Sequence, residues 1–201
     1  MTGLSERLLD MGFGHPRGPL GRLGGRLMAR GNAATEQRLV DFAALTPDES
    51  VLIIGPGPGI GVRAAATRAR HTVAVDPSET MLSACRKRCA DLIADGKVAL
   101  IQGDAANTTQ PDDSADVILS VNNVMLWPDW HAGFTELRRV LRPGGRILLS
   151  AHDKWLPGGL PALKAAVTHA GFIDTQTWTW EPPTRGATTA AQLRAHLPAT
   201  G

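Results

Sequence analysis

Short apolar runs and amphipathic stretches alternate regularly along this chain from residue 51 to residue 170. Five runs have the length and the apolar, β-branched content of buried strands: 51–54, 72–76, 98–104, 115–121 and 146–151. Stretches with apolar residues at helical spacing separate and follow these runs: 61–70, 78–95, 131–141 and 160–170. Strands that alternate with helices predict a mostly parallel α/β sheet with helices on both faces.

The two ends of this pattern predict different elements. Residues 34–45 carry apolar side chains at helical spacing before Thr46-Pro47, which predicts a helix packed on the core. Residues 171–198 contain an alternating run of β-branched residues and tryptophans, a Pro-Pro turn and a second short segment. Because no full helix separates these two segments, we expect an antiparallel C-terminal hairpin at the edge of the sheet.

The N-terminal segment has a composition of its own. Residues 12–31 hold seven glycines, four arginines and two prolines. We expect residues 1–31 to form a flexible or lid-like arm. Residues 32–201 are expected to form one domain, since 201 residues are too few for two domains of ordinary size.

Composition and charge argue against several classes of protein. The content of 43% hydrophobic and 20% charged residues is that of a globular protein, and a net charge of +2 is too small to indicate a nucleic-acid surface. No apolar run approaches the roughly 18 residues that span a bilayer. Cys85 and Cys89 lie four residues apart on a predicted helix, where two free thiols fit a reducing compartment. We therefore expect a cytoplasmic protein that binds neither membranes nor nucleic acid.

A glycine-rich run follows the first predicted strand directly. Residues 55–61 read Gly-Pro-Gly-Pro-Gly-Ile-Gly. The carboxyl end of a strand in an open α/β sheet is where ligands bind, and a loop without Cβ atoms lets the backbone approach a ligand closely. The helix that follows would point its free N–H groups to the same place. We interpret this run as a cofactor loop.

Polar side chains end the next three predicted strands. Asp76 lies 21 residues after Gly55, where a carboxylate accepts hydrogen bonds from ribose hydroxyls, although it also suits a cap together with Ser78. Asp104 offers an acceptor to the exocyclic amine of adenine, or alternatively caps the turn that follows it. Asn122 carries an amide that can bind a polar part of a ligand. These side chains are predicted to meet at one edge of the sheet.

Together these motifs resemble those of the class I S-adenosylmethionine-dependent methyltransferases. The similarity rests on the glycine loop, on VAVDPSETML, Gly-Asp-Ala and LRPGGRILLS, and on the run that ends in Trp127, and it covers about residues 35–175. These phrases are similar to the small-molecule, type 11-like branch. The resemblance implies a Rossmann-like sheet of seven strands with a reversed last hairpin, S-adenosyl-L-methionine as cofactor, and methyl transfer to a small-molecule acceptor. We expect a monomer or a homodimer.

The resemblance also implies roles for individual positions. Cofactor contacts are expected from Gly55, Pro56, Gly57, Gly59, Asp76, Pro77, Met81, Gly103, Asp104, Ala105 and Asn122. The glycines would contact the methionine part of the cofactor, Asp76 its ribose, and Asp104 its adenine. Trp127 and His152 lie on the same rim and are expected to contact the acceptor. His152 is also the best candidate for a base, but no catalytic role is assigned.

One position departs from the family pattern. Members usually carry an acidic residue two places before the first glycine, where it supports the loop and the cofactor's amino group. Here that place is Ile53. Either the amino group finds another acceptor, such as a backbone carbonyl or Asn122, or the cofactor binds weakly. A cofactor-binding but catalytically degenerate protein is therefore one alternative.

Three other enzyme classes fit the sequence less well. A nicotinamide-dependent oxidoreductase would show G-x-G-x-x-G, but the sixth places from Gly55 and Gly57 are Ile60 and Val62. The chain also has no tyrosine for a Tyr-Lys acid/base pair. A P-loop enzyme would need Gly-Lys-Ser/Thr. A nucleic-acid methyltransferase would be expected to carry an Asn/Asp-Pro-Pro-aromatic run or a Pro-Cys pair, and residues 122–125 read Asn-Asn-Val-Met.

Overall fold

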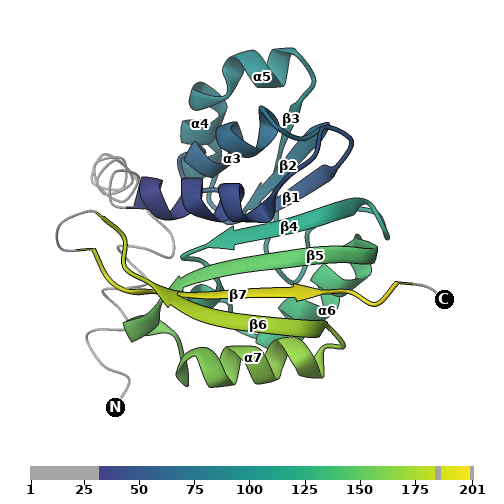
Figure 1. The fold of residues 1–201 in the computed structure, drawn as a ribbon. Coiled ribbons are helices and arrows are strands. Elements are labelled where there is room, and N and C mark those ends of the chain that lie inside the picture. The colour runs from purple at the N-terminus through teal and green to yellow at the C-terminus, as the bar shows by residue number, and fades with distance from the viewer. Residues whose placement is uncertain (1–31, 184–186, 200–201) are drawn as a thin grey trace.

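A seven-stranded sheet forms the centre of the computed structural model, which describes residues 32–183 and 187–199 (Figure 1). The strands follow the order β3-β2-β1-β4-β5-β7-β6. Their bounds are β1 Ser50–Ile54, β2 His71–Asp76, β3 Val98–Gln102, β4 Ala115–Val121, β5 Leu141–His152, β6 Ile173–Trp180 and β7 Ala190–His196. Strands β1 to β5 pair in parallel, and β7 runs antiparallel to both β5 and β6. The predicted fold class is confirmed, with β6 at the edge and β7 inside the sheet.

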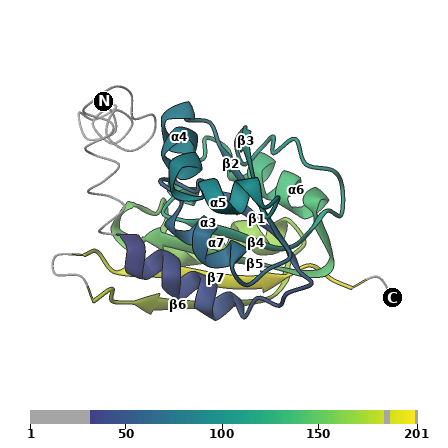
Figure 2. The same ribbon diagram turned by 90° about the horizontal axis from the view of Figure 1, so that it is seen from above.

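Helices cover both faces of this sheet. One face carries a helix over residues 32–43 together with α3 (Ile60–Ala66), α4 (Glu79–Arg88) and α5 (Ala90–Ala94). The opposite face carries α6 (Trp130–Val140) and α7 (Gly159–His169), and Figure 2 shows α6 and the helix over 32–43 on opposite sides. Two single 3-10 turns, η2 (Val124–Leu126) and η3 (Asp153–Trp155), follow β4 and β5. Because the helices cover the two faces of the sheet, the ends of the strands carry the connecting loops. The arm expected over residues 1–31 lies outside the described residues.

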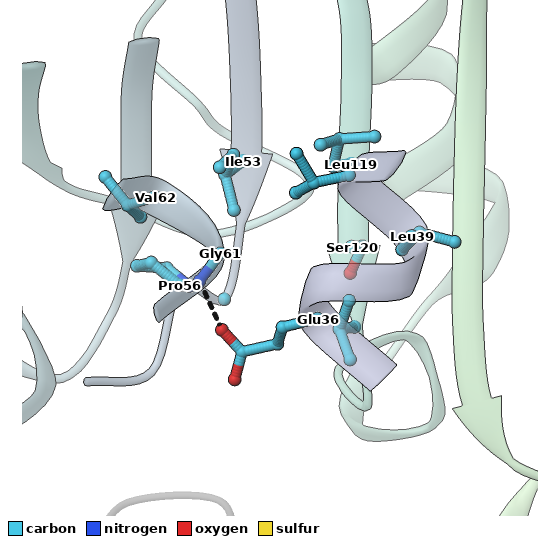
Figure 3. A pocket seen from close by; sticks show the side chains of 11 residues that line it. Glu36, Leu39, Ile53, Pro56, Gly61, Val62, Leu119 and Ser120 are labelled. Atoms are coloured by element: carbon cyan, nitrogen blue, oxygen red, sulfur yellow. Dashed lines mark hydrogen bonds between the residues drawn. The ribbon is translucent and has the colours of Figure 1, made fainter. Parts of the chain in front are cut away.

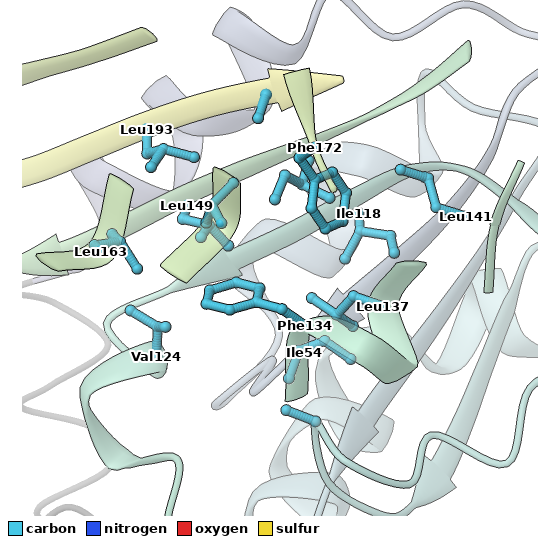
Figure 4. Packing of buried hydrophobic residues seen from close by; sticks show 14 of the residues in the cluster. Ile54, Ile118, Val124, Phe134, Leu137, Leu141, Leu149, Leu163, Phe172 and Leu193 are labelled. Carbon is cyan, nitrogen blue, oxygen red and sulfur yellow. The ribbon is translucent and has the colours of Figure 1, made fainter. Parts of the chain in front are cut away.

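Two apolar cores result from the alternation of side chains along each strand. Leu52 and Ile54 of β1 point to the core under α6 and α7, where Phe134 is fully buried (Figure 4). Val51 and Ile53 point to the other core, which is closed by the helix over 32–43 and by α3. Each strand is therefore fixed in register by both of its faces.

Several of the predicted element boundaries were wrong, and the helix expected over 61–70 already ends at Ala66. The helix expected over 78–95 breaks at Cys89, whose backbone angles of φ −110° and ψ 21° separate α4 from α5. The strand expected to reach Asp104 ends at Gln102, because the Asp104 carboxylate accepts the N–H groups of Ala106 and Asn107 and turns the chain. Both free thiols, Cys85 and Cys89, are buried as unpaired side chains.

Strand β5 begins earlier than the sequence predicts. Leu141 already pairs with Ala115, and the register then shifts so that Arg146 pairs with Val117. The Pro-Gly-Gly segment of the motif LRPGGRILLS lies in this bulge, where Gly144 has a φ of +79°. These turn-forming residues therefore bend a strand and do not end a helix.

The helix over 32–43 is held firmly on the sheet. The Arg146 guanidinium of β5 donates to the Ala43 carbonyl at 2.6 Å and to Glu49 Oε1 at 2.6 Å, with both charged side chains largely buried. Leu39 and Val40 of the same helix are buried in the core. Side chains on the inner face of this helix therefore keep a fixed position over β1 and β4.

Every helix in the described part of the chain is too short or too polar to span a lipid bilayer.

Candidate functional site

The carboxyl ends of the parallel strands form one edge, and the candidate residues gather there. The glycine loop follows β1, and Asn122 follows the neighbouring strand β4. The chain leaves β1 toward β2 on one side and leaves β4 toward β5 on the other. The space between β1 and β4 is therefore the switch point at which open α/β sheets bind ligands. Asp76 ends β2 one strand away, and His152 ends β5 on the other side.

The three glycines of the loop do different things. Gly55, Gly57 and Gly59 all have positive φ angles, of 68°, 51° and 86°. A Cβ at Gly55 would lie 2.3 Å from Asn123 Cγ, and one at Gly59 would lie 2.5 Å from Cys85 Sγ. A Cβ at Gly57 would meet nothing within 4 Å among the described residues. Two of the glycines are thus required by packing, and Gly57 is the one that faces open space.

The start of α3 is less available to a ligand than we expected. The backbone N–H of Gly61 donates to Glu36 Oε2 at 2.6 Å. That N–H group is therefore already satisfied by a side chain from the helix over 32–43. Pro56 and Gly55 line the same hollow from the loop. The expectation that this helix start presents only free N–H groups was wrong for Gly61.

Asp76 lies where the sequence placed it, at the tip of β2. Its side chain is 6% exposed, and Oδ1 accepts the Ser78 N–H at 2.8 Å. Ser78 in turn accepts the Met81 N–H and caps α4, while Pro77 is exposed and Met81 is buried. Asp76 and Ser78 therefore make the capping contacts that the sequence offered as an alternative role for Asp76. Contact of Asp76 with a ribose stays a prediction.

The Gly-Asp-Ala turn after β3 shows the capping arrangement as well. Asp104 Oδ1 accepts the N–H groups of Ala106 and Asn107, both at 2.9 Å. A Cβ at Gly103 would lie 2.7 Å from the Asn107 carbonyl oxygen, so the tight turn requires glycine there. Ala105 is buried in the core, and Asp104 is exposed. Recognition of adenine by these residues stays a prediction.

The loop that carries this turn is anchored by Glu136 of α6. Glu136 Oε1 accepts both the backbone N–H and the hydroxyl of Thr108, at 2.9 and 2.6 Å. The same carboxylate is held by Arg139 at 2.8 Å, and Arg139 also contacts Asp112. The pKa of Glu136 is lowered to about 2, chiefly by the hydrogen bond from Arg139 and further by those from Thr108.

Replacing Glu136 by glutamine is expected to lower the free energy of unfolding by about 1–2 kcal/mol at pH 7, the usual worth of charge-assisted hydrogen bonds. Because the folded pKa is depressed, this stability is present above about pH 4.5 and is lost as the pH falls toward 2. Urea unfolding at pH 7, 5 and 4 measures the difference, which should shrink at the acid end. Asp112→Asn is the exposed control and should change stability by less than about 0.5 kcal/mol. A pH-independent difference would contradict this account.

Asn122 has an unusual backbone and an unsatisfied side chain. Its φ is +51°, and its Oδ1 is buried without a hydrogen-bond partner in the described part of the chain. Buried polar atoms are almost always paired, so this oxygen at the switch point is available to accept a hydrogen bond from a donor. The neighbouring Asn123 is used differently, because its Oδ1 accepts the indole N–H of Trp127 at 2.6 Å.

The side chain of Trp127 points toward α6. The side chain is half-buried, and its ring lies edge-on to Phe134 with centroids 5.3 Å apart. A Cβ at Gly133 would lie 2.7 Å from this ring, so the absence of a side chain there makes room for the indole. Packing on α6 holds the indole in this position. Its contact with an acceptor stays a prediction.

His152 lies at the end of β5, on the rim of the edge. Its ring meets Trp155 edge-on with centroids 4.8 Å apart, and its Nδ1 is buried without a partner among the described residues. Burial lowers the pKa of His152, and the nearby Lys154 lowers it further. The imidazole is therefore neutral near pH 7 and keeps a lone pair that can accept a proton.

Glu36 is the residue that sequence reasoning missed. It lies three residues before Leu39 and four before Val40, so it shares their buried face of the helix. That spacing was a usable signal, because a carboxylate on an apolar face is rarely buried without a purpose. Phe42 belongs to the same helix, which was predicted to pack on the core, but its side chain is 40% exposed and lies against Trp178.

Comparison with known proteins gives three kinds of match. Residues 52–149 match the family described as "Methyltransferase domain". An uncharacterized methyltransferase of Bacillus subtilis, YdaC, is 30% identical over 134 residues, which are 66% of this chain and 72% of that protein. The arsenite methyltransferase of Halobacterium salinarum is 35% identical over 112 residues, 54% of this chain but only 28% of that protein.

A solved structure shows the same fold over almost the whole chain. Phosphoethanolamine N-methyltransferase 2 of Haemonchus contortus, in complex with S-adenosyl-L-methionine, gives a TM-score of 0.75. The match covers 96% of this chain and 60% of that protein at 16% identity. At that identity the likeness concerns the fold, which is the one described above.

Proposed function

The chain belongs to the methyltransferase domain family, as a class I S-adenosylmethionine-dependent methyltransferase, and we propose that it methylates a small molecule at the carboxyl edge of its sheet. The observation that carries this proposal is the switch point between β1 and β4. There the open Gly57 and the unsatisfied Asn122 Oδ1 lie on neighbouring strand ends.

The residues of the edge fit the cofactor. Gly57 leaves its backbone open to an extended ligand, and the buried Oδ1 of Asn122 calls for a hydrogen-bond donor. An amino group is such a donor, and the cofactor's methionine part carries one. Asp76 at the tip of β2 supplies a carboxylate for the ribose hydroxyls. When bound, the cofactor supplies a methyl group that its sulfonium already activates.

Transfer from a sulfonium needs alignment more than acid/base chemistry. The chain therefore has to hold the acceptor in line with the methyl group and to exclude water. If the acceptor carries a proton that must leave, a base raises the rate. His152 is neutral near pH 7 and stands on the rim beside Trp155. It is the residue we propose to take up such a proton.

The chemistry around His152 favours a flat or apolar acceptor. The half-buried rings of Trp155 and Trp127 offer stacking faces, and the cation of Lys154 lies over Trp155 at 4.5 Å. The relatives do not narrow the choice, because their names give acceptors as different as arsenite and demethylmenaquinone. The chain also spans only 28% and 45% of those two proteins. We therefore propose a small acceptor of this class and no single compound.

Calorimetry on the full chain tests the proposal. We expect one molecule of S-adenosylmethionine or its demethylated product, S-adenosylhomocysteine, to bind each chain, and NADH to give no heat. A panel of phenols, quinols and amines with methyl-labelled cofactor then measures transfer into the acceptor. Absence of cofactor binding would contradict the proposed function. Binding without transfer to any acceptor would favour the degenerate alternative.

A further inference from the structure

The missing acid at position 53 leaves an apolar wall beside the glycine loop. Ile53 is 6% exposed and packs with Leu39 and Leu119 in the core. Where the family resemblance implies a carboxylate, this chain presents a hydrocarbon side chain. The end of β1 therefore offers no negative charge to the positively charged amino group of the cofactor.

Glu36 brings a carboxylate to the same place from another element. It lines the hollow in which Ile53, Gly55 and Gly61 also lie, and in Figure 3 it reaches from its helix toward the loop. The other residues that line this hollow are uncharged: Leu39, Val40, Pro56, Val62, Leu119, Ser120 and Val121. Glu36 is thus the charged side chain of the hollow.

The carboxylate has room for another partner. Oε2 accepts the Gly61 N–H at 2.6 Å, and within the described residues Oε1 accepts no hydrogen bond. A carboxylate offers about four acceptor sites, so a single N–H leaves most of them unused. The residue is nevertheless only 9% exposed, so solvent does little to satisfy them. An uncompensated acid at this depth is costly unless a cation or a proton joins it.

The charge state of Glu36 follows from its surroundings. Burial raises the pKa of Glu36 to about 7, while the Gly61 hydrogen bond and the more distant Arg88 act in the opposite direction. Arg88 Nε donates a hydrogen bond to the Pro58 carbonyl at 2.8 Å. The charge of Glu36 also contributes to raising the pKa of the Cys85 thiol of α4. The residues of β1, α3 and β4 that line the hollow carry no titratable group. The carboxylate is therefore poised to ionise when a cation arrives.

We propose that Glu36 binds the amino group of the cofactor's methionine part and so replaces the acidic side chain that this chain lacks at Ile53. The inference rests on the proposed function, because it requires the cofactor at this edge. An ammonium donates up to three hydrogen bonds and carries the charge that the hollow needs. Glu36 then contacts the cofactor from a helix that precedes the glycine loop.

The test compares two ligands that differ in one group. Calorimetry measures the binding of S-adenosylhomocysteine and of its deaminated analogue, in which hydrogen replaces the amino group. Wild type should prefer the amino-bearing ligand by about tenfold or more, the usual strength of a charge-assisted hydrogen bond. Glu36→Gln keeps the shape of the side chain and its acceptor for Gly61 but removes the charge. It should weaken S-adenosylhomocysteine binding by about tenfold and leave the analogue within twofold.

Controls separate this contact from a purely structural role. If Glu36 only holds the loop through Gly61, Glu36→Gln will weaken both ligands by the same factor, which would overturn the proposal. Equal affinities of wild type for the two ligands would overturn it too. Asp41→Asn removes an exposed carboxylate from the same helix and should change neither affinity. If wild type binds neither ligand, the proposed function itself fails, which is a distinguishable outcome.

The pH dependence adds an independent readout. Since the neutral acid must lose its proton before it can bind an ammonium, wild-type affinity for S-adenosylhomocysteine should rise as the pH increases through about 7. Measurements stay below about pH 7.5, where the ligand's own amino group remains protonated. Glu36→Gln should flatten this slope, and the deaminated analogue should not show it. A slope that persists in Glu36→Gln would count against the proposal.

Discussion

Asp76→Ala is expected to weaken the binding of S-adenosylhomocysteine by at least about 100-fold. A carboxylate that accepts two ribose hydroxyls loses two charge-assisted hydrogen bonds, each worth about 1.5–3 kcal/mol, and each 1.4 kcal/mol corresponds to about a factor of ten. Asp76 is 6% exposed at the tip of β2, so little solvent replaces the lost contact. Isothermal titration calorimetry on the folded variant measures the effect.

Two further variants control for the local turn. Asp76→Asn keeps an acceptor for the Ser78 N–H, which Oδ1 of Asp76 now receives at 2.8 Å, but removes the charge. We expect it to bind about tenfold more weakly than wild type, with an unchanged melting temperature. Glu79→Gln alters an exposed acid at the start of α4, two residues after Pro77, and should leave binding unchanged. If Asp76→Ala folds and binds as wild type does, the ribose assignment is wrong.

Gly59→Ala and Gly57→Ala are expected to separate stability from binding. At Gly59 the new Cβ would lie 2.5 Å from Cys85 Sγ and 3.1 Å from Cys85 Cα, at a φ of +86°. Overpacking of this kind, together with backbone strain, should lower the free energy of unfolding by about 2–4 kcal/mol. At Gly57 the Cβ meets open space, so the loss should be about 1–2 kcal/mol from strain alone. Urea unfolding measures both values.

Binding should show the opposite order. A methyl group at Gly57 points into the open space where we propose the cofactor, so S-adenosylhomocysteine should bind at least tenfold more weakly while the protein stays folded. The double variant Gly59→Ala/Cys85→Ala removes one of the colliding atoms and should recover part of the lost stability. Equal stabilities of Gly59→Ala and wild type would contradict the packing role of Gly59.

Much of the fold could be predicted because buried parallel strands are apolar on both faces. The five runs from 51 to 151 are visible for that reason, and the structure confirms all five as strands. Boundaries were harder, because they depend on single contacts. The turn at Asp104 follows from its two backbone hydrogen bonds, and the bulge near Gly144 follows from pairing with β4. Neither contact leaves a pattern in the hydrophobic spacing.

The site was predictable only as far as strand ends determine it. Parallel strands bring their carboxyl ends to one edge, so Asp76, Asn122 and His152 had to meet there. The direction of Trp127 depended on the gap above Gly133, which only the packed structure reveals. Glu36 was missed because its contact with Gly61 spans 25 residues and joins two separate elements. The spacing of Glu36 to Leu39 indicates its burial, but nothing in the sequence pattern indicates its partner.

The place of Glu36 in the chain has a consequence for how this protein is divided and compared. The family match begins at residue 52, after the helix that carries Glu36. A fragment cut to the matched region would keep every recognised motif and yet lack the carboxylate that faces Gly61. Judged by its motifs alone, the chain looks defective at Ile53. Considered as a folded unit, it places a buried carboxylate beside the glycine loop from outside the region that matches the family.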